Sequence, residues 1–237
     1  MRSVLALLLV TVAACQGNKA PPPAAGSGSA PVAKKAPEAK SQVPMGDKIE
    51  LPKDDGTPPK KSSGPLDPAL ADKLIKLTYP GFEMQDRTNK SAFEVRFLTT
   101  RPRLAVTVTI TPCNECVPMD LEKWQAKKAG LQSQLLAEEL RDLPDTKWEI
   151  NKIDLHGTPA IATYQFGMLD GKDDQGQPQG AYSNAYAIYY NDGVNQMRVV
   201  AEYKDDWVAR PDMLAIAPKE DLEKLARAFT LAYTHAW

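Results

Sequence analysis

Aromatic residues are confined to the last two thirds of this 237-residue chain. The first of its 8 tyrosines, 5 phenylalanines and 4 tryptophans is Tyr79, whereas half of the 20 prolines fall between Pro21 and Pro65. The first third therefore has too few large apolar side chains to offset the entropy of ordering its backbone. We predict that residues 66–237 form one folded domain and that residues 15–65 are a disordered linker rich in proline, alanine and lysine.

The chain begins with the pattern of an exported bacterial protein. Arg2 precedes an apolar run over residues 4–12, which is too short to span a bilayer. The two alanines before Cys15 resemble the lipobox of bacterial lipoproteins. This resemblance implies that residues 1–14 are a signal peptide that is removed, and that Cys15 then carries fatty acyl chains such as palmitate. An ordinary secretory signal that contains an incidental cysteine is the alternative.

Lipidation at Cys15 would place the protein at the cell envelope. One acyl chain binds a bilayer marginally, so the two or three chains of a lipoprotein imply a long-lived anchor. In lipoproteins an Asp after the cysteine often signals retention in the inner membrane. Gln16 occupies that position here, which implies the outer membrane.

Charge is nearly balanced along the chain. Its 29 basic and 30 acidic residues give a net charge of −1, which argues against a general nucleic-acid binder, because such proteins carry a basic excess. We expect two kinds of partner, namely the lipid bilayer through Cys15 and an envelope protein or ligand whose identity the sequence does not give. We expect no cofactor.

Hydrophobic periodicity predicts helices at both ends of the domain and one between two groups of strands. Asp67 and Pro68 suit the start of a short first helix, and a last helix starts at Pro218. We predict a long middle helix over residues 120–142 and a mobile polar loop over residues 170–180. Alternating segments predict strands over residues 93–97, 104–110, 147–155, 160–167, 182–190 and 197–203, with a bulge or a break in the third of them.

The predicted fold class is α+β, with an antiparallel sheet of about six or seven strands between helices. The order of elements resembles the PsbP-like fold, an α/β/α sandwich. The resembling segments are residues 79–82, residues 155–160 with Tyr164, and residues 218–229. Because that family shares no common active site, the resemblance implies a binding or assembly module and supplies no functional residues.

Cys113 and Cys116 form the one cysteine pair that remains if Cys15 is lipidated. Outside the cytosol we expect them to form a disulfide. One interpretation is a local clip in the turn between a strand and the middle helix. The alternative is a thiol–disulfide redox centre, and the Thr158–Pro159 dipeptide resembles a turn that thioredoxin-like enzymes place beside their cysteines. Zinc would require more ligands than this chain offers near the pair.

The remaining polar clusters give weaker signals. Asp170, Asp173 and Asp174 fail the EF-hand pattern because Lys172 and Gln175 occupy required positions. The only two histidines, His156 and His235, are interpreted as turn or surface residues. A candidate binding surface combines the outward-facing aromatic residues with the acidic loop, and it comprises Tyr182, Tyr189, Asp170, Asp173 and Asp174.

These observations predict a function in binding and not in catalysis. We expect a membrane-tethered lipoprotein of the cell envelope that acts as a non-enzymatic binding or assembly module. No metal site and no catalytic residue is predicted. The alternative is a redox-active lipoprotein that uses Cys113 and Cys116.

Overall fold

The protein is described by a computed structural model that covers residues 50–99, 104–135, 146–172, 178–203 and 218–237. All of these described residues belong to one compact unit. Cys15 and most of the predicted linker lie outside the described residues.

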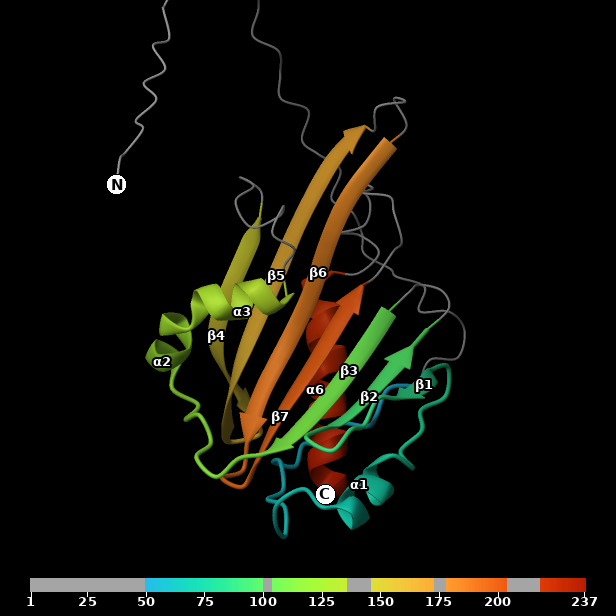
Figure 1. Ribbon diagram of the computed structural model, residues 1–237, viewed down its shortest axis with the longest axis vertical. Helices are drawn as coiled ribbons and strands as arrows, with labels where there is room; N and C mark the ends of the chain where they lie inside the picture. Colours follow the sequence, from blue (N-terminus) through green and yellow to red (C-terminus); the bar gives the residue numbers. More distant parts are fainter. Residues whose placement is uncertain (1–49, 100–103, 136–145, 173–177, 204–217) are drawn as a thin grey trace, which may run out of the picture. The chain divides into compact units, whose positions relative to one another are not determined.

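One antiparallel sheet of seven strands organises the domain (Figure 1). Every neighbouring pair of strands is antiparallel, and the spatial order is β1-β2-β3-β7-β6-β5-β4. The strands are β1 (Glu83–Asp86), β2 (Phe93–Leu98), β3 (Leu104–Pro112), β4 (Lys147–Leu155), β5 (Thr158–Lys172), β6 (Pro178–Asn191) and β7 (Asn195–Tyr203). The predicted α+β class and the number of strands are confirmed.

Four helices accompany the sheet in the described part of the chain. They are α1 (Pro68–Leu74), α2 (Leu121–Ala126), α3 (Lys128–Leu135) and α6 (Lys219–Ala236). The side chain of Asp67 caps α1 by accepting a hydrogen bond from the backbone N–H of Leu70 at 2.7 Å. This cap and Pro68 in the first turn of α1 confirm the predicted start of that helix.

Helix α6 packs on one face of the sheet and α2 and α3 lie over the other (Figure 1). The larger core lies under α6, where Phe229 contacts Tyr79, Phe97 and Phe82 with ring centroids 4.9, 5.0 and 5.5 Å apart. A smaller core lies under α2 and α3, around Trp124 and Tyr189. The strand period of two explains this division, because alternate residues of β5, β6 and β7 enter different cores.

The predicted middle helix is wrong as one continuous element. It is broken at Lys127, whose backbone N–H donates to the carbonyl of Trp124 at 3.0 Å, a bond that spans three residues where an α-helix spans four. The second piece contains Gly130, a weak helix former. Residues 136–142 of the predicted helix lie outside the described residues.

The predicted bulge or break in β4 is also wrong. Residues Lys147 to Leu155 pair with β5 in one unbroken register. The apolar positions change parity because the strand serves both cores: Trp148 and Ile150 pack under α2, whereas Ile153 and Leu155 pack on the α6 side.

The polar segment predicted as a loop over residues 170–180 belongs in part to the sheet. Strand β5 continues to Lys172 and β6 starts at Pro178, with Asp170 paired to Gly180. Backbone pairing therefore extends this hairpin beyond the apolar residues from which we predicted the strands. Only residues 173–177 remain between the two strands, and they lie outside the described residues.

The predicted linker boundary at residue 65 is wrong, because residues 50–66 lie along the folded domain as a segment without helix or strand. We call this segment the strap. Pro52 and Pro59 are buried, and Leu51 packs against the larger core. The strap contains few apolar residues, so composition predicted disorder, but hydrogen bonds to distant parts of the chain hold it in place.

Candidate functional site

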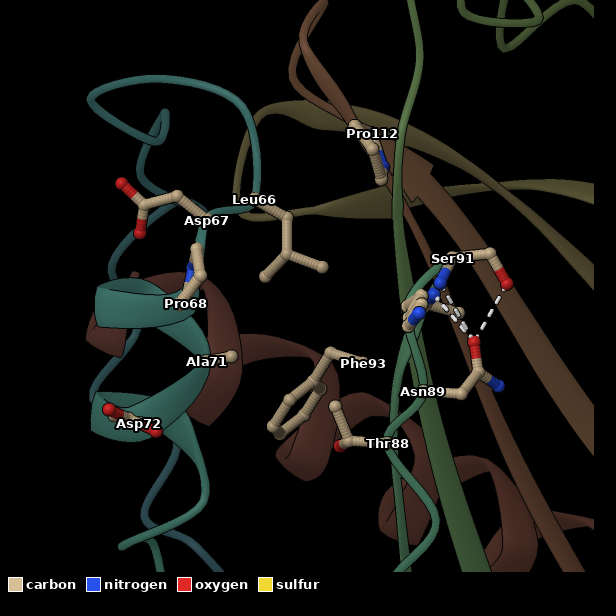
Figure 2. A pocket seen from close by; sticks show the side chains of 12 residues that line it. Leu66, Asp67, Pro68, Ala71, Asp72, Thr88, Asn89, Ser91, Phe93 and Pro112 are labelled. Carbon is tan, nitrogen blue, oxygen red and sulfur yellow. Dashed lines mark hydrogen bonds between the residues drawn. The ribbon is translucent and has the colours of Figure 1, made fainter.

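A pocket of about 500 Å³ lies between helix α1 and the turn that joins β1 to β2 (Figure 2). The end of the strap and the last residue of β3 complete its wall. We call it the α1 pocket. Its size falls in the range of sites for small molecules and short peptide segments.

The interior of the α1 pocket is apolar. Figure 2 shows the side chains of Leu66, Ala71 and Phe93 pointing into the space between α1 and the turn. Phe93 is fully buried and forms the floor, because it is also part of the core under α6. Such an interior favours an apolar group of a ligand, since burying apolar surface contributes about 25 cal/mol per Å².

Polar side chains surround the mouth of the pocket. The carboxylates of Asp67 and Asp72 point away from the apolar interior, along the outer side of α1 (Figure 2). Thr88, Asn89, Lys90 and Ser91 lie on the opposite wall. The rim thus places acidic groups on one wall and a lysine on the other, around an interior without charge.

Local hydrogen bonds shape the wall formed by the β1–β2 turn. The side-chain carbonyl oxygen of Asn89 accepts from the backbone N–H and the hydroxyl of Ser91, at 2.9 and 2.7 Å, and from the N–H of Ala92 at 3.1 Å (Figure 2). Asn side chains favour such turns because they replace a backbone acceptor. The conformation of this turn is therefore fixed by bonds within residues 89–92.

The wall formed by the strap depends on a residue far away in the sequence. The side chain of Asn195, which is fully buried at the start of β7, accepts from the N–H of Leu66 at 2.8 Å. Its amide nitrogen donates to the hydroxyl of Ser62 at 2.8 Å and to the carbonyl of Gly64 at 2.9 Å. Asn195 thus fixes the path of the strap just before α1 begins.

Asp192 strengthens this attachment from the same hairpin. Its carboxylate accepts from the N–H of Ser62 at 2.7 Å and from the N–H groups of Val194 and Asn195 at 3.0 and 2.8 Å. Burial alone opposes ionisation, but these bonds and the Ser62 hydroxyl together lower the pKa of Asp192 below its ordinary value.

The structure joins Cys113 and Cys116 in a disulfide, with their Cα atoms 5.1 Å apart. The pair follows β3, and the N–H of Cys113 donates to the carbonyl of Val194 at 2.9 Å. Cys116 borders a second, more open hollow of about 590 Å³, which Val117, Lys123 and Lys127 also line. The pair therefore lies at the edge of a hollow with two lysines.

The surroundings of the pair differ from those of thioredoxin-like enzymes. Helix α2 begins at Leu121 with Asp120 as its cap, so Cys116 is not at a helix N-terminus. Pro159 lies in β5, and β7 and β6 separate that strand from β3. Three strand spacings amount to roughly 14 Å, so the Thr158–Pro159 dipeptide does not adjoin the cysteines.

The structure describes only part of the predicted surface around Tyr189. The expected exposure of Tyr189 is wrong: it is 3% exposed and packs on Trp124 with ring centroids 4.6 Å apart. Tyr189 points to the face that α2 covers, which the sequence did not reveal. Asp173 and Asp174 lie outside the described residues, as do the side chains of Tyr182 and Asp170, although their backbones belong to β6 and β5.

Both histidines contact the strap. His156 lies in the tight turn between β4 and β5 with a φ of 50°, and its Nε2 atom is 2.7 Å from a carboxylate oxygen of Asp54. His235, near the end of α6, places its Nε2 atom 3.1 Å from the carbonyl of Pro58. The predicted turn and surface positions are confirmed, but these contacts could not be read from the sequence.

The sequence did not predict the α1 pocket. Its two walls start from local signals, the Asp67 cap and the Asn89 turn, but the space between them depends on how α1 and the strap pack. Within the described ranges, no group of three or more His, Cys, Asp or Glu residues could hold a metal ion. None of the helices in the described part is long and apolar enough to cross a bilayer.

Comparisons with protein-family models, with curated proteins and with solved structures give no match to this chain.

Proposed function

We propose that this chain is a lipoprotein of the bacterial cell envelope whose domain acts as a non-enzymatic binding module, and that the α1 pocket is its ligand site. The observation that carries the proposal is the pocket itself, about 500 Å³ with a floor at Phe93. An apolar interior with a few polar groups at its rim is the usual character of a ligand site. The ligand is a molecule with an apolar body.

The proposed location at the cell envelope rests on the N-terminal sequence pattern. Acyl chains on Cys15 hold the domain at the bilayer, and Gln16 favours the outer membrane over the inner one. Mass spectrometry of native material tests this address. We expect a mature N-terminus at Cys15 that carries acyl chains, and a Cys15→Ser variant that lacks them. An intact leader, or a free thiol at this position, contradicts the anchor.

The fold assignment within this proposal is the PsbP-like α/β/α sandwich. Its support is the order of elements, with a helix before three strands, helices between β3 and β4, and a closing helix after β7. The packing of α6 on one face and of α2 on the other agrees with a sandwich. An experimental structure of the domain would test the assignment.

Binding at the α1 pocket is tested with the dye anilinonaphthalene sulfonate as an apolar probe. We expect saturable binding to the mature protein and at least roughly tenfold weaker binding to Ala71→Leu, because the added side chain fills the pocket. Ala69→Leu is the matched control, since Ala69 lies on the same helix but is exposed outside the pocket. Equal binding by the two variants contradicts the assignment.

A redox function of the cysteine pair is the second candidate. The observation in its favour is the hollow beside Cys116, where Lys123 and Lys127 would stabilise a thiolate. Reduction of insulin disulfides by the reduced protein, abolished in Cys113→Ser, would support this function. A strongly reducing potential of the Cys113–Cys116 disulfide, without reduction of insulin, supports the interpretation as a structural clip.

A further inference from the structure

The first half of the strap is attached to the domain by hydrogen bonds with the two histidines and the C-terminal tryptophan. Asp54 bonds to His156, as described above, and the hydroxyl of Thr57 lies 3.2 Å from the Nε2 atom of His235. The indole N–H of Trp237 donates to the carbonyl of Lys60 at 2.7 Å. Three separate contacts therefore hold residues 54–60 against the turn after β4 and the end of α6.

The second half is attached to the β6–β7 hairpin. Asp192 and Asn195 accept hydrogen bonds from the N–H groups of Ser62 and Leu66, respectively. The amide nitrogen of Asn195 donates to Ser62 and Gly64. Most of these bonds use backbone groups of the strap, so they depend on its backbone conformation. A single hairpin thus holds residues 62–66, shortly before α1.

Most of this attachment is polar. Within residues 50–66 only Pro52 and Pro59 are buried, Leu51 and Leu66 are half-buried against the larger core, and most of the other side chains are exposed. Segments with little buried apolar surface open at a lower free energy than the core does. The strap can therefore leave the domain while the sheet and α6 stay folded.

Detachment of the strap would change the α1 pocket directly. Leu66 is both the last strap residue and part of the pocket wall, and Asn195 holds its backbone. Pro112, on the wall nearby, pairs with the same Asn195 across the sheet. Release of the strap removes one wall, whereas Phe93 and the β1–β2 turn stay in place.

We propose that the strap is a releasable gate of the α1 pocket. The gate is closed when Asp192 and Asn195 are hydrogen-bonded to residues 62–66, and it is open when these hydrogen bonds are broken. The inference rests on the proposed function in that it concerns the same pocket. Residues 50–65 also lead towards Cys15. When the contacts of residues 54–60 open together with those of residues 62–66, release lengthens the connection to the anchor by up to roughly 55 Å of extended chain. A ligand that binds only while the strap is attached stabilises the attached state. By linkage, tension on the chain between Cys15 and the domain, which favours the detached state, lowers the affinity for that ligand.

Native-state hydrogen exchange of the full mature chain, followed by NMR without any ligand, tests the gate. The N–H groups of Ser62 and Leu66 report on the strap, those of Ala71 and Ser91 on the pocket, and those of β6 and β7 on global unfolding. We expect Ser62 and Leu66 to exchange at least about 100-fold faster than the core strands, through a local opening. Exchange at the rate of the core would overturn the proposal, since the strap would then open only on global unfolding.

A pair of neighbouring serines supplies the variant and its control. Ser62→Ala removes the hydroxyl that bonds to Asp192 and Asn195, whereas Ser63 is exposed. We expect Ser62→Ala to accelerate exchange at Leu66 by roughly three- to tenfold and to shift the resonances of Ala71 and Ser91, with core exchange unchanged. Ser63→Ala should do neither. Faster exchange at Leu66 without a change at the pocket would overturn the coupling, even if the pocket binds its probe.

Discussion

The indole ring of Trp124 packs on the phenol ring of Tyr189, with centroids 4.6 Å apart and an angle of 49° between the planes. Both side chains are 3% exposed. This contact attaches α2 to the sheet, because Trp124 is the buried residue of that helix and Tyr189 lies near the middle of the smaller core. The indole N–H also donates to the carbonyl of Pro118 at 3.0 Å.

Trp124→Ala is expected to destabilise the domain by about 3–5 kcal/mol, since it removes a buried aromatic ring and a hydrogen bond. Tyr189→Phe is the contrasting change. Within the described residues the Tyr189 hydroxyl is buried without a well-formed hydrogen bond, so its loss should cost less than about 1 kcal/mol. Urea unfolding of both variants measures the difference. A large loss in Tyr189→Phe would show that the hydroxyl has a bound partner.

Phe229 should be among the costliest positions of the larger core. It is fully buried and contacts three other aromatic rings. Phe229→Ala is expected to lower the free energy of unfolding by about 3–5 kcal/mol. Lys224→Ala, on the exposed side of α6, is the control and should change it by less than about 0.5 kcal/mol. Similar losses in the two variants would contradict the placement of α6.

Two glycine-to-alanine changes are expected to act in opposite directions. Gly130 lies inside α3 with open space where a Cβ would sit, so Gly130→Ala should stabilise the protein by about 0.5–1 kcal/mol. Gly157 has a φ of 90° in the turn after β4, so Gly157→Ala should destabilise it by about 1 kcal/mol or more. Thermal unfolding compares the two. The same sign in both variants would contradict the backbone geometry.

Acid should loosen the strap before it unfolds the core. The pKa of Asp192 is lower in the folded protein than its ordinary value, so its contribution to stability is fully present above that ordinary value, near 4. It is lost as the pH falls through the lower folded pKa. Hydrogen exchange at Ser62, corrected for the intrinsic pH dependence, should therefore accelerate below about pH 4. In Asp192→Asn we expect this pH dependence to weaken and the strap to open more readily at neutral pH.

Loss of the disulfide should have a modest effect on stability. The loop between Cys113 and Cys116 is so short that the entropy model gives at most about 2 kcal/mol. We expect the double variant Cys113→Ser/Cys116→Ser to stay folded, with a change of that size in chemical unfolding. Complete unfolding of this variant would show that the pair does more than clip the segment between β3 and α2.

The sequence predicted the elements well where one side of the chain faces a core. The strand around Val95 follows a strict period of two, because burial on one side imposes it. The strand around Val108 and the helix around Leu225 keep a one-sided pattern over part of their length. Prediction failed at β4, where Trp148 and Leu155 enter different cores. A strand that serves both faces has no single period, and a change of parity then resembles a bulge.

The α1 pocket was not predicted because the residues that form it are far apart in the sequence. The side chain of Asn195 accepts a hydrogen bond from the N–H of Leu66, which is 129 residues away in the sequence. No local sequence pattern predicts such a bond. The same reasoning explains the error at the strap, since its composition is that of a disordered linker. Charge, proline content and hydropathy describe a segment by itself, whereas the strap is ordered by the groups that receive it.

The β6–β7 hairpin attaches two other segments at once. Its Asn191 side chain donates to the carbonyl of Val117, beyond the disulfide, while Asp192 and Asn195 hold the strap. An inserted or deleted residue in this short turn would shift Asn191 relative to Asp192 and Asn195, so that these side chains could no longer bind both segments at the same time. Evolution is therefore expected to keep the length of this turn constant, and engineers should choose another loop for insertions.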